Sequence, residues 1–403
     1  MLVSLLAYPL VDWHLRAIDV AAEYRFWDFG AYGGAVNRWL AGEPIYVPDD
    51  DGPGYHGSYL YPPVFLLLFA PFTALPPDTA APVWSACSVA FLWLGLQALV
   101  AALGLDLDPV DRGLLLLAVV GFQPLLLSVK LGQASAFVAG LLAVAGAALV
   151  AGERVRADTR RTDRVGRLLD VASGVATAVA GTLKLAYAPV GAHLLVRRDR
   201  FVGAVATGLC LLVVSVAVFG VGTHLTYLDV LRWGVTLGTE ARSPTLWLAP
   251  YYAPLFAVPG SLAVRLAGAL AVAVLALCST ADRETFALGV AATPLLAPEA
   301  YTYTFVALLP AVVVLVATEL ARDGYPALPV VGLGLCHVHA FGLRLAGDVV
   351  PPLVGGGPTA AIVVSLLQPG LWGVLVVAGL AAVRVGQSAS APELPEVWPS
   401  IRS

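Results

Sequence analysis

The stretch FVGAVATGLCLLVVSVAVFGVGTHLTYL, residues 201–228, contains no Asp, Glu, Lys or Arg. A helix that crosses a bilayer needs about 20 mainly apolar residues, so this stretch is long enough to span a membrane. Three further runs, 266–281, 300–318 and 349–383, also lack these four residue types. The strict apolar and polar alternation of membrane barrels is missing. The sequence therefore predicts an all-α, polytopic integral membrane protein of about 10–13 transmembrane or re-entrant helices.

The composition supports the same class of protein. Hydrophobic residues make up 59% of the chain and charged residues 12%, and the mean hydropathy is +0.83, which excludes an ordinary water-soluble domain. The net charge of −4 lies mostly in loops, and the basic patch of a nucleic-acid-binding protein is missing. The cysteines Cys87, Cys210, Cys278 and Cys336 are far apart within apolar segments, which favours free thiols over disulfides or metal ligands.

The order of segments predicts one transmembrane domain over residues 1–385, with a first external loop at about 13–60, and a disordered cytoplasmic tail over 386–403. Met1 leads directly into an apolar stretch without a basic region before it. We therefore expect a retained first helix rather than a cleaved signal peptide.

Arginine placement sets the predicted orientation. The loop 152–170 and the turn at 197–200 carry most of the arginines in this half of the chain, namely Arg154, Arg156, Arg160, Arg161, Arg164, Arg167, Arg197, Arg198 and Arg200. The positive-inside rule places both in the cytoplasm. Residues 171–196 must then enter and leave the same face, as a broken hairpin with its tip near Lys184 and Pro189. If the N-terminus is inside, counting back from this anchor leaves 61–76 unable to cross fully, so that either this segment is re-entrant or the start of the chain is misjudged.

In this topology, ionisable groups near apolar segments gather on the external half. They are Asp28, Lys130, Lys184, Arg242, Arg265, Glu299 and Arg344. Such groups are costly to place in a membrane and point to function, and an anionic external substrate would explain the cations. Lys130 and Lys184 are the two lysines of the chain. A compact ammonium suits a phosphate, and the alternative is that both lysines snorkel from helix ends toward the headgroups.

Asp28 lies in Trp27-Asp28-Phe29-Gly30-Ala31-Tyr32, a short amphipathic segment after the first apolar stretch. We interpret it as the candidate working carboxylate. The alternative is a solvated or helix-capping residue, because the same loop also carries the acidic run 49–51. Glu299, between Pro298 and Ala300, either caps the next helix or faces a cavity.

The sequence predicts neither a metal site nor a cofactor, and it leaves a need for a divalent ion open. His337 and His339 are two residues apart and so point to different faces of a helix. Phosphate-binding loops of the P-loop type, nucleophile elbows and dinucleotide fingerprints are missing from the sequence.

Several motifs together resemble glycosyltransferase family 87, a family of polyprenol-phosphate-sugar-dependent membrane enzymes that includes mycobacterial mannosyltransferases extending phosphatidylinositol mannosides. The matching positions are Asp28 and Tyr32, Gly42-Glu43-Pro44-Ile45-Tyr46, Tyr61-Pro62-Pro63, Gly132-Gln133, Lys184 before Pro189 with Arg197-Arg198 behind it, and Pro294 to Pro310. The resemblance covers most of residues 24–315 and rests on the order and spacing of short motifs.

The resemblance implies a C-type glycosyltransferase fold and a general base at Asp28, which matches the family's aspartate in the first external loop. It also implies substrate-binding roles, which we assign to Tyr32, Tyr61, Gln133, Lys184, Arg242, Glu299, Tyr303 and Arg344. The chain departs from the family near residue 300. Relatives often have a histidine after a Ser-Pro pair there, whereas this chain has Ala297-Pro298-Glu299 and then Tyr303.

The sequence therefore predicts a multi-pass cell-membrane hexosyltransferase with an external active site and a cytoplasmic C-terminus. Its donor would be a polyprenyl-phosphate-linked sugar, with mannose the preferred choice, and its acceptor a lipid, a glycan or a protein. Two alternatives stay open, a transporter or flippase of lipid-linked or anionic substrates, and a non-catalytic relative that binds polyprenyl phosphate.

Overall fold

The computed structural model describes residues 25–48, 54–55, 57–157, 163–237, 251–252, 260–297, 300–355 and 357–388, with the single positions 7, 10, 14 and 17. The first half contains α2 (Trp27–Leu40), η1 (Pro63–Phe65), α3 (Leu66–Phe69), η2 (Ala70–Ala74), α4 (Pro77–Leu103), α5 (Pro109–Val120), α6 (Gln123–Leu131), α7 (Ser135–Ala157), α8 (Asp163–Leu183), η3 (Leu185–Val196) and α9 (Arg198–Leu237). The second half contains β1 (Tyr251–Tyr252), α10 (Ser261–Cys278), α11 (Asp282–Leu296), β2 (Ala300–Tyr301), η5 (Thr302–Ala307), α12 (Leu308–Ala321), α13 (Ala327–His337), α14 (His339–Val354), α15 (Gly357–Leu366) and α16 (Pro369–Ser388).

The predicted all-α class is confirmed. In the described ranges, the strands are limited to β1 and β2, which are two residues each and pair antiparallel with Tyr251 opposite Tyr301. Six described helices are long and apolar enough to cross a membrane, namely α4, α7, α9, α10, η5 with α12, and α16. The bent pair of α5 and α6 forms a seventh candidate. The chain is a multi-pass membrane protein.

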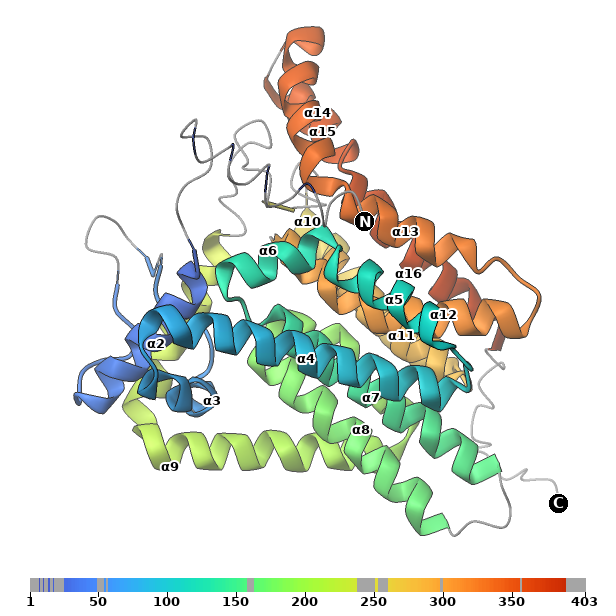
Figure 1. Cartoon of the computed structure of the whole chain (residues 1–403), viewed down its shortest axis with the longest axis horizontal. Helices are drawn as coiled ribbons and strands as arrows, with labels where there is room; N and C mark the ends of the chain where they lie inside the picture. The colour runs from blue at the N-terminus through green and yellow to red at the C-terminus, as the bar shows by residue number, and fades with distance from the viewer. Residues whose placement is uncertain are drawn as a thin grey trace, which may run out of the picture.

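Helix α7 lies at the centre of the bundle, with α4 and α8 along its sides (Figure 1). Most of its apolar residues are buried inside the protein. Helices α9 and α10 lie at the periphery and expose large apolar side chains, such as Val213 at 66% and Leu270 at 66%. Such a surface is unfavourable in water, and it fits helices that face lipid.

The connection from α5 to α7 forms a bent path that ends in a tight turn. Helices α5 and α6 meet at an angle of 59°, and Pro124 lies in the first turn of α6, where a missing N–H costs little. Gly132 ends α6 with a φ of 67°, in the left-handed region that glycine adopts readily. Only Gly132, Gln133 and Ala134 separate α6 from α7, so this turn is held by two helices.

Helix α8 and η3 form the two legs of a broken hairpin. Lys184 separates them with an extended backbone, φ −130° and ψ 100°, and both legs pack together while η3 also packs against α11. The break lies at Lys184, one of the two residues near which the tip was predicted, whereas the other, Pro189, lies inside η3.

Residues 61–76 contain three short helical pieces, η1, α3 and η2, that together run from Pro63 to Ala74. Twelve residues of this kind are too few to cross a bilayer as one helix, and the re-entrant course of this segment stays a prediction. Helix α16 continues to Ser388, so the first residues of the predicted tail are helical. The rest of the tail and most of the expected first helix lie outside the described residues.

Candidate active site

Asp28 lies in the first turn of α2, and the end of α6 fixes the start of that helix. The residue before the helix, Phe26, has a φ of 57°, and its N–H donates to the carbonyl oxygen of Lys130 at 2.8 Å. A backbone hydrogen bond between two segments leaves little freedom in how they approach each other. Asp28 is therefore held against the turn that joins α6 to α7.

Gln133, in that turn, binds the carboxylate directly. Its Nε2 donates to Asp28 Oδ2 at 2.9 Å, and its Oε1 accepts from Tyr61 Oη at 2.7 Å and from Tyr32 Oη at 2.9 Å. The backbone N–H of Ala134 also donates to Oε1 at 2.7 Å. Because a backbone N–H can only donate, the amide oxygen must face Ala134, and the amide nitrogen must then face Asp28.

A cluster of aromatic rings holds these tyrosines in place. Tyr32 stacks on Phe69 with ring centroids 4.3 Å apart, and its hydroxyl lies 3.1 Å from that of Tyr61. The hydroxyl of Tyr46 donates to the backbone oxygen of Tyr61 at 2.6 Å. Tyr59 packs edge-on to Tyr61 at 5.8 Å. Buried aromatic contacts of this kind restrict side-chain rotation, so the residues of the Tyr61-Pro62-Pro63 motif are rigidly positioned.

Lys184 approaches the same turn from the tip of the hairpin. Its Nζ donates to Ser135 Oγ at 2.8 Å, and it lies 4.8 Å from the ring centroid of Tyr303 and 6.0 Å from that of Tyr61. Both distances are within cation–π range. Gln133 and Ser135 are two residues apart, so one turn holds both the carboxylate and the ammonium.

Burial and charge act in opposite directions on Asp28. Burial disfavours the carboxylate and raises the pKa of Asp28 to about 6, and the ammonium of Lys184 and the hydrogen bond from Gln133 limit this rise. A carboxyl group with a pKa near the working pH can accept a proton and later release it.

Gly132 allows α2 to approach the turn closely. A Cβ at this position would lie 2.6 Å from Phe29 Cβ and 3.5 Å from the Phe29 backbone nitrogen. Its φ of 67° adds a second reason for glycine. The Gly132-Gln133 motif thus combines a residue that permits the contact between the turn and α2 with a residue that binds Asp28.

An apolar groove of about 390 Å³ lies next to this site. Phe26, two residues before Asp28, lines it together with residues of α4, α5 and α6, namely Pro82, Ser85, Ala86, Val89, Val120, Leu125, Leu126 and Val129. The groove offers almost no polar surface, so it suits a hydrocarbon chain rather than a sugar.

Six of the predicted site residues come together here. They are Asp28, Tyr32, Tyr61, Gln133, Lys184 and Tyr303. Arg242 and Glu299 lie outside the described residues. Arg344 lies on α14, and its side chain lies outside what the structure describes, so the roles of these three remain predictions.

Two histidines that the sequence places close together accept hydrogen bonds from separate elements. His337 Nδ1 accepts from the N–H of Gln123 at 3.1 Å, and His339 Nδ1 accepts from the N–H of Gly370 at 3.1 Å. Both imidazoles therefore bind backbone groups at the ends of neighbouring helices.

The sequence analysis missed Ser135 as a site residue. A serine at the start of α7 resembles an ordinary helix-capping residue, and its contact with Lys184 joins positions 49 residues apart. Its place two residues after Gln133, beside the Gly132-Gln133 motif, is the signal that the sequence offers.

Comparison with known proteins identifies a family. The model of glycosyltransferase family 87 matches residues 59–341, which is more than half of the chain. The match includes Tyr61, Gln133, Lys184 and Tyr303, and it begins after Asp28 and Tyr32. No curated protein matches the chain.

Two solved structures are similar over most of the chain. They are the crystal structures of ArnT from Cupriavidus metallidurans, bound to undecaprenyl phosphate and in the apo state. Their TM-scores are 0.41 and 0.40 and their identities 17% and 15%, over 96% of this chain and 77% of theirs. On the extent of the family match, the chain belongs to glycosyltransferase family 87.

Proposed function

We propose that this protein transfers a sugar, preferably mannose, from a polyprenyl-phosphate donor to a lipid, glycan or protein acceptor at the external face of the cell membrane. Asp28 is the general base in this proposal. The observation that carries it is the single turn that binds the Asp28 carboxylate through Gln133 and the Lys184 ammonium through Ser135.

The reaction needs a base on one side of the sugar and a cation on the other. Asp28 takes the proton of the acceptor hydroxyl, whose oxygen forms a new bond to the anomeric carbon. The bond between that carbon and the phosphate oxygen breaks, and the polyprenyl phosphate leaves with the electron pair. Lys184 stabilises the charge that develops on this phosphate.

The tyrosines suit a sugar between these two groups. The ring of Tyr61 lies near Lys184, and the Tyr61 hydroxyl donates to Gln133. The ring of Tyr303 also lies near Lys184, with its centroid 4.8 Å from the ammonium nitrogen. Aromatic faces with polar edges bind the apolar and hydroxyl faces of a ring-shaped ligand. Arg242, Glu299 and Arg344 are proposed as further partners for the donor.

The apolar groove supports a substrate with a hydrocarbon chain. It reaches Phe26, two residues from Asp28, so a chain within it would present its polar end near the carboxylate. Either a polyprenyl donor or a lipid acceptor has such a chain.

The proposed sidedness rests on α7. This helix has 23 residues, about 34 Å at 1.5 Å per residue, which is long enough to cross a bilayer core of about 30 Å. It begins with Ser135 in the candidate site and ends with Arg154 and Arg156 in its last turn. The positive-inside rule assigns the arginine end to the cytoplasm, so the site would be external. Ser388, the last residue of α16, lies with its Oγ 3.0 Å from Ser279 Oγ, three residues before Asp282, which pairs with Arg156, so the C-terminus would be cytoplasmic.

A reconstituted assay would test the proposal. Purified protein in lipid nanodiscs would receive a synthetic polyprenyl-phosphate mannose and a lipid extract as acceptor, and the release of polyprenyl phosphate and the formation of a mannosylated product would be measured. Transfer is expected without a nucleotide sugar. Movement of the intact donor across a vesicle bilayer without product would instead support a flippase, and binding with neither outcome would support a non-catalytic relative.

A further inference from the structure

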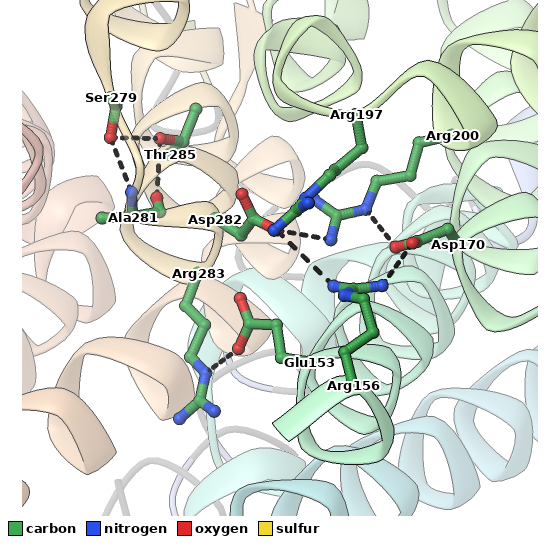
Figure 2. Close-up of polar contacts among 10 residues, drawn as sticks. All are labelled: Glu153, Arg156, Asp170, Arg197, Arg200, Ser279, Ala281, Asp282, Arg283 and Thr285. Atoms are coloured by element: carbon green, nitrogen blue, oxygen red, sulfur yellow. Dashed lines mark hydrogen bonds and ion pairs between the residues drawn. The ribbon is translucent and has the colours of Figure 1, made fainter. Parts of the chain in front are cut away.

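A buried cluster of ion pairs lies at the opposite end of α7 and α8 from Ser135 and Lys184 (Figure 2). Its members come from elements that are far apart in the chain: Arg156 on α7, Asp170 on α8, Arg197 after η3, Arg200 on α9 and Asp282 on α11. Charges removed from water need partners, and here each partner belongs to another element. The cluster therefore joins the ends of α7, α8, α9 and α11.

Arg200 is the bridging residue of this cluster. Its Nε donates to Asp170 Oδ1 at 2.8 Å and its Nη2 to Asp282 Oδ2 at 2.7 Å. The Arg200 side chain is 0% exposed, and the two carboxylates are 5% and 2% exposed. The planar guanidinium fork suits two carboxylates at once. Figure 2 shows Arg200 between them, so one side chain links α8 and α11 through α9.

Each carboxylate also has a second partner. Arg156 pairs with Asp170, and Arg197 pairs with Asp282 at 3.3 Å. Loss of the Arg200 guanidinium would therefore leave neither carboxylate without a cation. It would remove the shorter of the two bridges between Asp170 and Asp282, because the second bridge, through Arg156, reaches Asp282 only at 3.9 Å.

The backbones of α8 and α9 approach closely beside this link. A Cβ at Gly174 would clash with the Arg200 backbone, and a Cβ at Gly203 would lie 2.7 Å from the Val171 carbonyl oxygen. Small residues on both helices thus bring Arg200 within reach of Asp170. The contact between the helices leaves little room for α8 to slide.

The two legs of the hairpin, α8 and η3, have similar lengths when measured from the ion-pair cluster. Lys184 follows Asp170 by 14 positions, a rise of about 21 Å in an α-helix. The 12 residues of η3 rise about 24 Å at the pitch of a 3₁₀-helix. Both legs start at the ion pairs and meet at Lys184. The register of α8 against η3 at the ion pairs therefore sets the position of Lys184.

We propose that Arg200, together with Asp170 and Asp282, is a positioning group that fixes the register of α8 against η3 and thereby holds Lys184 at Ser135. The inference rests on the proposed function only for its kinetic consequence, a donor that binds less well when Lys184 moves. Its structural consequence is testable without any assay of transfer.

The lysine content of the chain makes this test direct. Lys130 and Lys184 are the only lysines in the sequence. A bulky amine-acylating reagent at alkaline pH, followed by mass spectrometry of the full-length protein in nanodiscs, reports the access of each amine. Lys130 serves as the internal reference, because it lies at the end of α6 and outside the ion-pair cluster. The measured quantity is the ratio of Lys184 to Lys130 labelling.

The Arg200→Gln variant is expected to raise this ratio about threefold or more, because an amine that leaves its contacts becomes accessible. Arg384→Gln is the matched control. It removes another ion pair with a buried carboxylate, that of Arg384 with Glu319 at 2.6 Å, which joins α16 to α12 and does not touch the hairpin. The control is expected to lower the unfolding temperature and leave the labelling ratio unchanged.

Arg200→Lys provides a second test if Arg200→Gln does not fold. It keeps the charge, and a single ammonium cannot reproduce the two-sided fork, so an intermediate rise in the ratio is expected. An unchanged ratio in Arg200→Lys and in any folded Arg200→Gln overturns the proposal and makes the cluster a stabilising element only.

Kinetics separate this inference from the proposed function. A displaced Lys184 is expected to raise the KM for the polyprenyl-phosphate donor about threefold, with a smaller change in kcat. If the labelling ratio rises and the donor KM does not, the positioning role stands and the proposed role of Lys184 is wrong.

Discussion

The side-chain amide of Gln133 donates a hydrogen bond of 2.9 Å to the carboxylate of Asp28, 105 residues earlier in the chain. The other end of the amide is fixed by the N–H of Ala134 and by two tyrosine hydroxyls. Asp28 is therefore oriented by a group that cannot turn over without losing its hydrogen bonds to Asp28 and from Ala134.

Gly132→Ala is expected to impair both stability and transfer. The new Cβ would meet Phe29 at 2.6 Å in a backbone with φ 67°, so α2 must move away from the turn. A misplacement of about 1 Å at a reacting group can cost about 100-fold in rate. Stability should fall by about 2–4 kcal/mol, measured by thermal unfolding beside the transfer rate.

Gly104→Ala is the matched control for that variant. Gly104 also has a φ of 67°, and its Cβ would meet the flexible end of the Arg154 side chain rather than α2. It should cost about 1 kcal/mol in stability and leave transfer unchanged. Equal losses of activity in the two variants would argue against a specific role for the contact between Gly132 and Phe29.

The transfer rate should depend on pH through Asp28. The pKa of this carboxyl is raised to about 6, mainly by burial, and a general base works only when deprotonated. We expect kcat/KM to fall about tenfold per pH unit below this value. Lys184→Gln removes the cation that lowers the pKa, so the acidic limb should move up by about one unit.

A pH profile that lacks an acidic limb near pH 6 in the wild-type protein would count against Asp28 as the base. If the acidic limb of the pH profile lies at the same pH in Lys184→Gln as in the wild-type protein, Asp28 and Lys184 do not interact.

Ser135→Ala should weaken donor binding and spare the chemical step. The variant removes the 2.8 Å hydrogen bond to Lys184, and hydrogen bonds to charged groups contribute about 1.5–3 kcal/mol. The donor KM should rise about tenfold. Ser88→Ala, at an equally buried serine of α4 whose hydroxyl binds no described residue, should leave KM unchanged, and an equal rise in both variants would contradict the assignment.

The sequence predicts the fold and the hairpin for physical reasons that need no tertiary contacts. Long uncharged runs must lie in a bilayer, and two arginine-rich ends on one face force the intervening segment to turn back at Lys184. The contacts of Asp28 with Gln133 and of Lys184 with Ser135 cannot be read this way, because helical periodicity carries no information about partners at such separations.

The buried ion pairs were missed for a related reason. Arg200 and Asp170 lie next to arginine-rich loops. In the sequence, charges in such loops indicate only which face of the membrane is cytoplasmic. Their burial depends on Gly174 and Gly203, which let α8 and α9 approach closely. A glycine in an apolar helix gives no sign of which backbone it faces, so the bridge between Asp170 and Asp282 appears only in three dimensions.

Asp28→Asn should stabilise the folded protein at neutral pH. The folded-state pKa of Asp28 is raised above its ordinary value of 3.8 to about 6, so the folded protein favours the protonated form. The contribution of Asp28 to stability is therefore fully present below pH 3.8 and is lost as pH rises through 6. The neutral variant should avoid this loss, gaining at most about 3 kcal/mol near pH 7 at about 1.4 kcal/mol per pKa unit.

The gain should disappear in acid, where the wild-type carboxyl is also neutral. Thermal unfolding of both proteins across this pH range measures the difference. A variant that is less stable than the wild type at neutral pH would show that Asp28 is stabilised as a carboxylate.

The most direct test of the central claim is sugar transfer by Asp28→Asn with donor binding measured on the same sample. Asp78→Asn, at an exposed aspartate in the first turn of α4, is the matched control. We predict that Asp28→Asn binds polyprenyl-phosphate mannose about as well as the wild type and loses transfer by about 100-fold or more, as expected for the loss of a general base, while Asp78→Asn retains full activity. Transfer at the wild-type rate by Asp28→Asn would contradict the claim that Asp28 is the base.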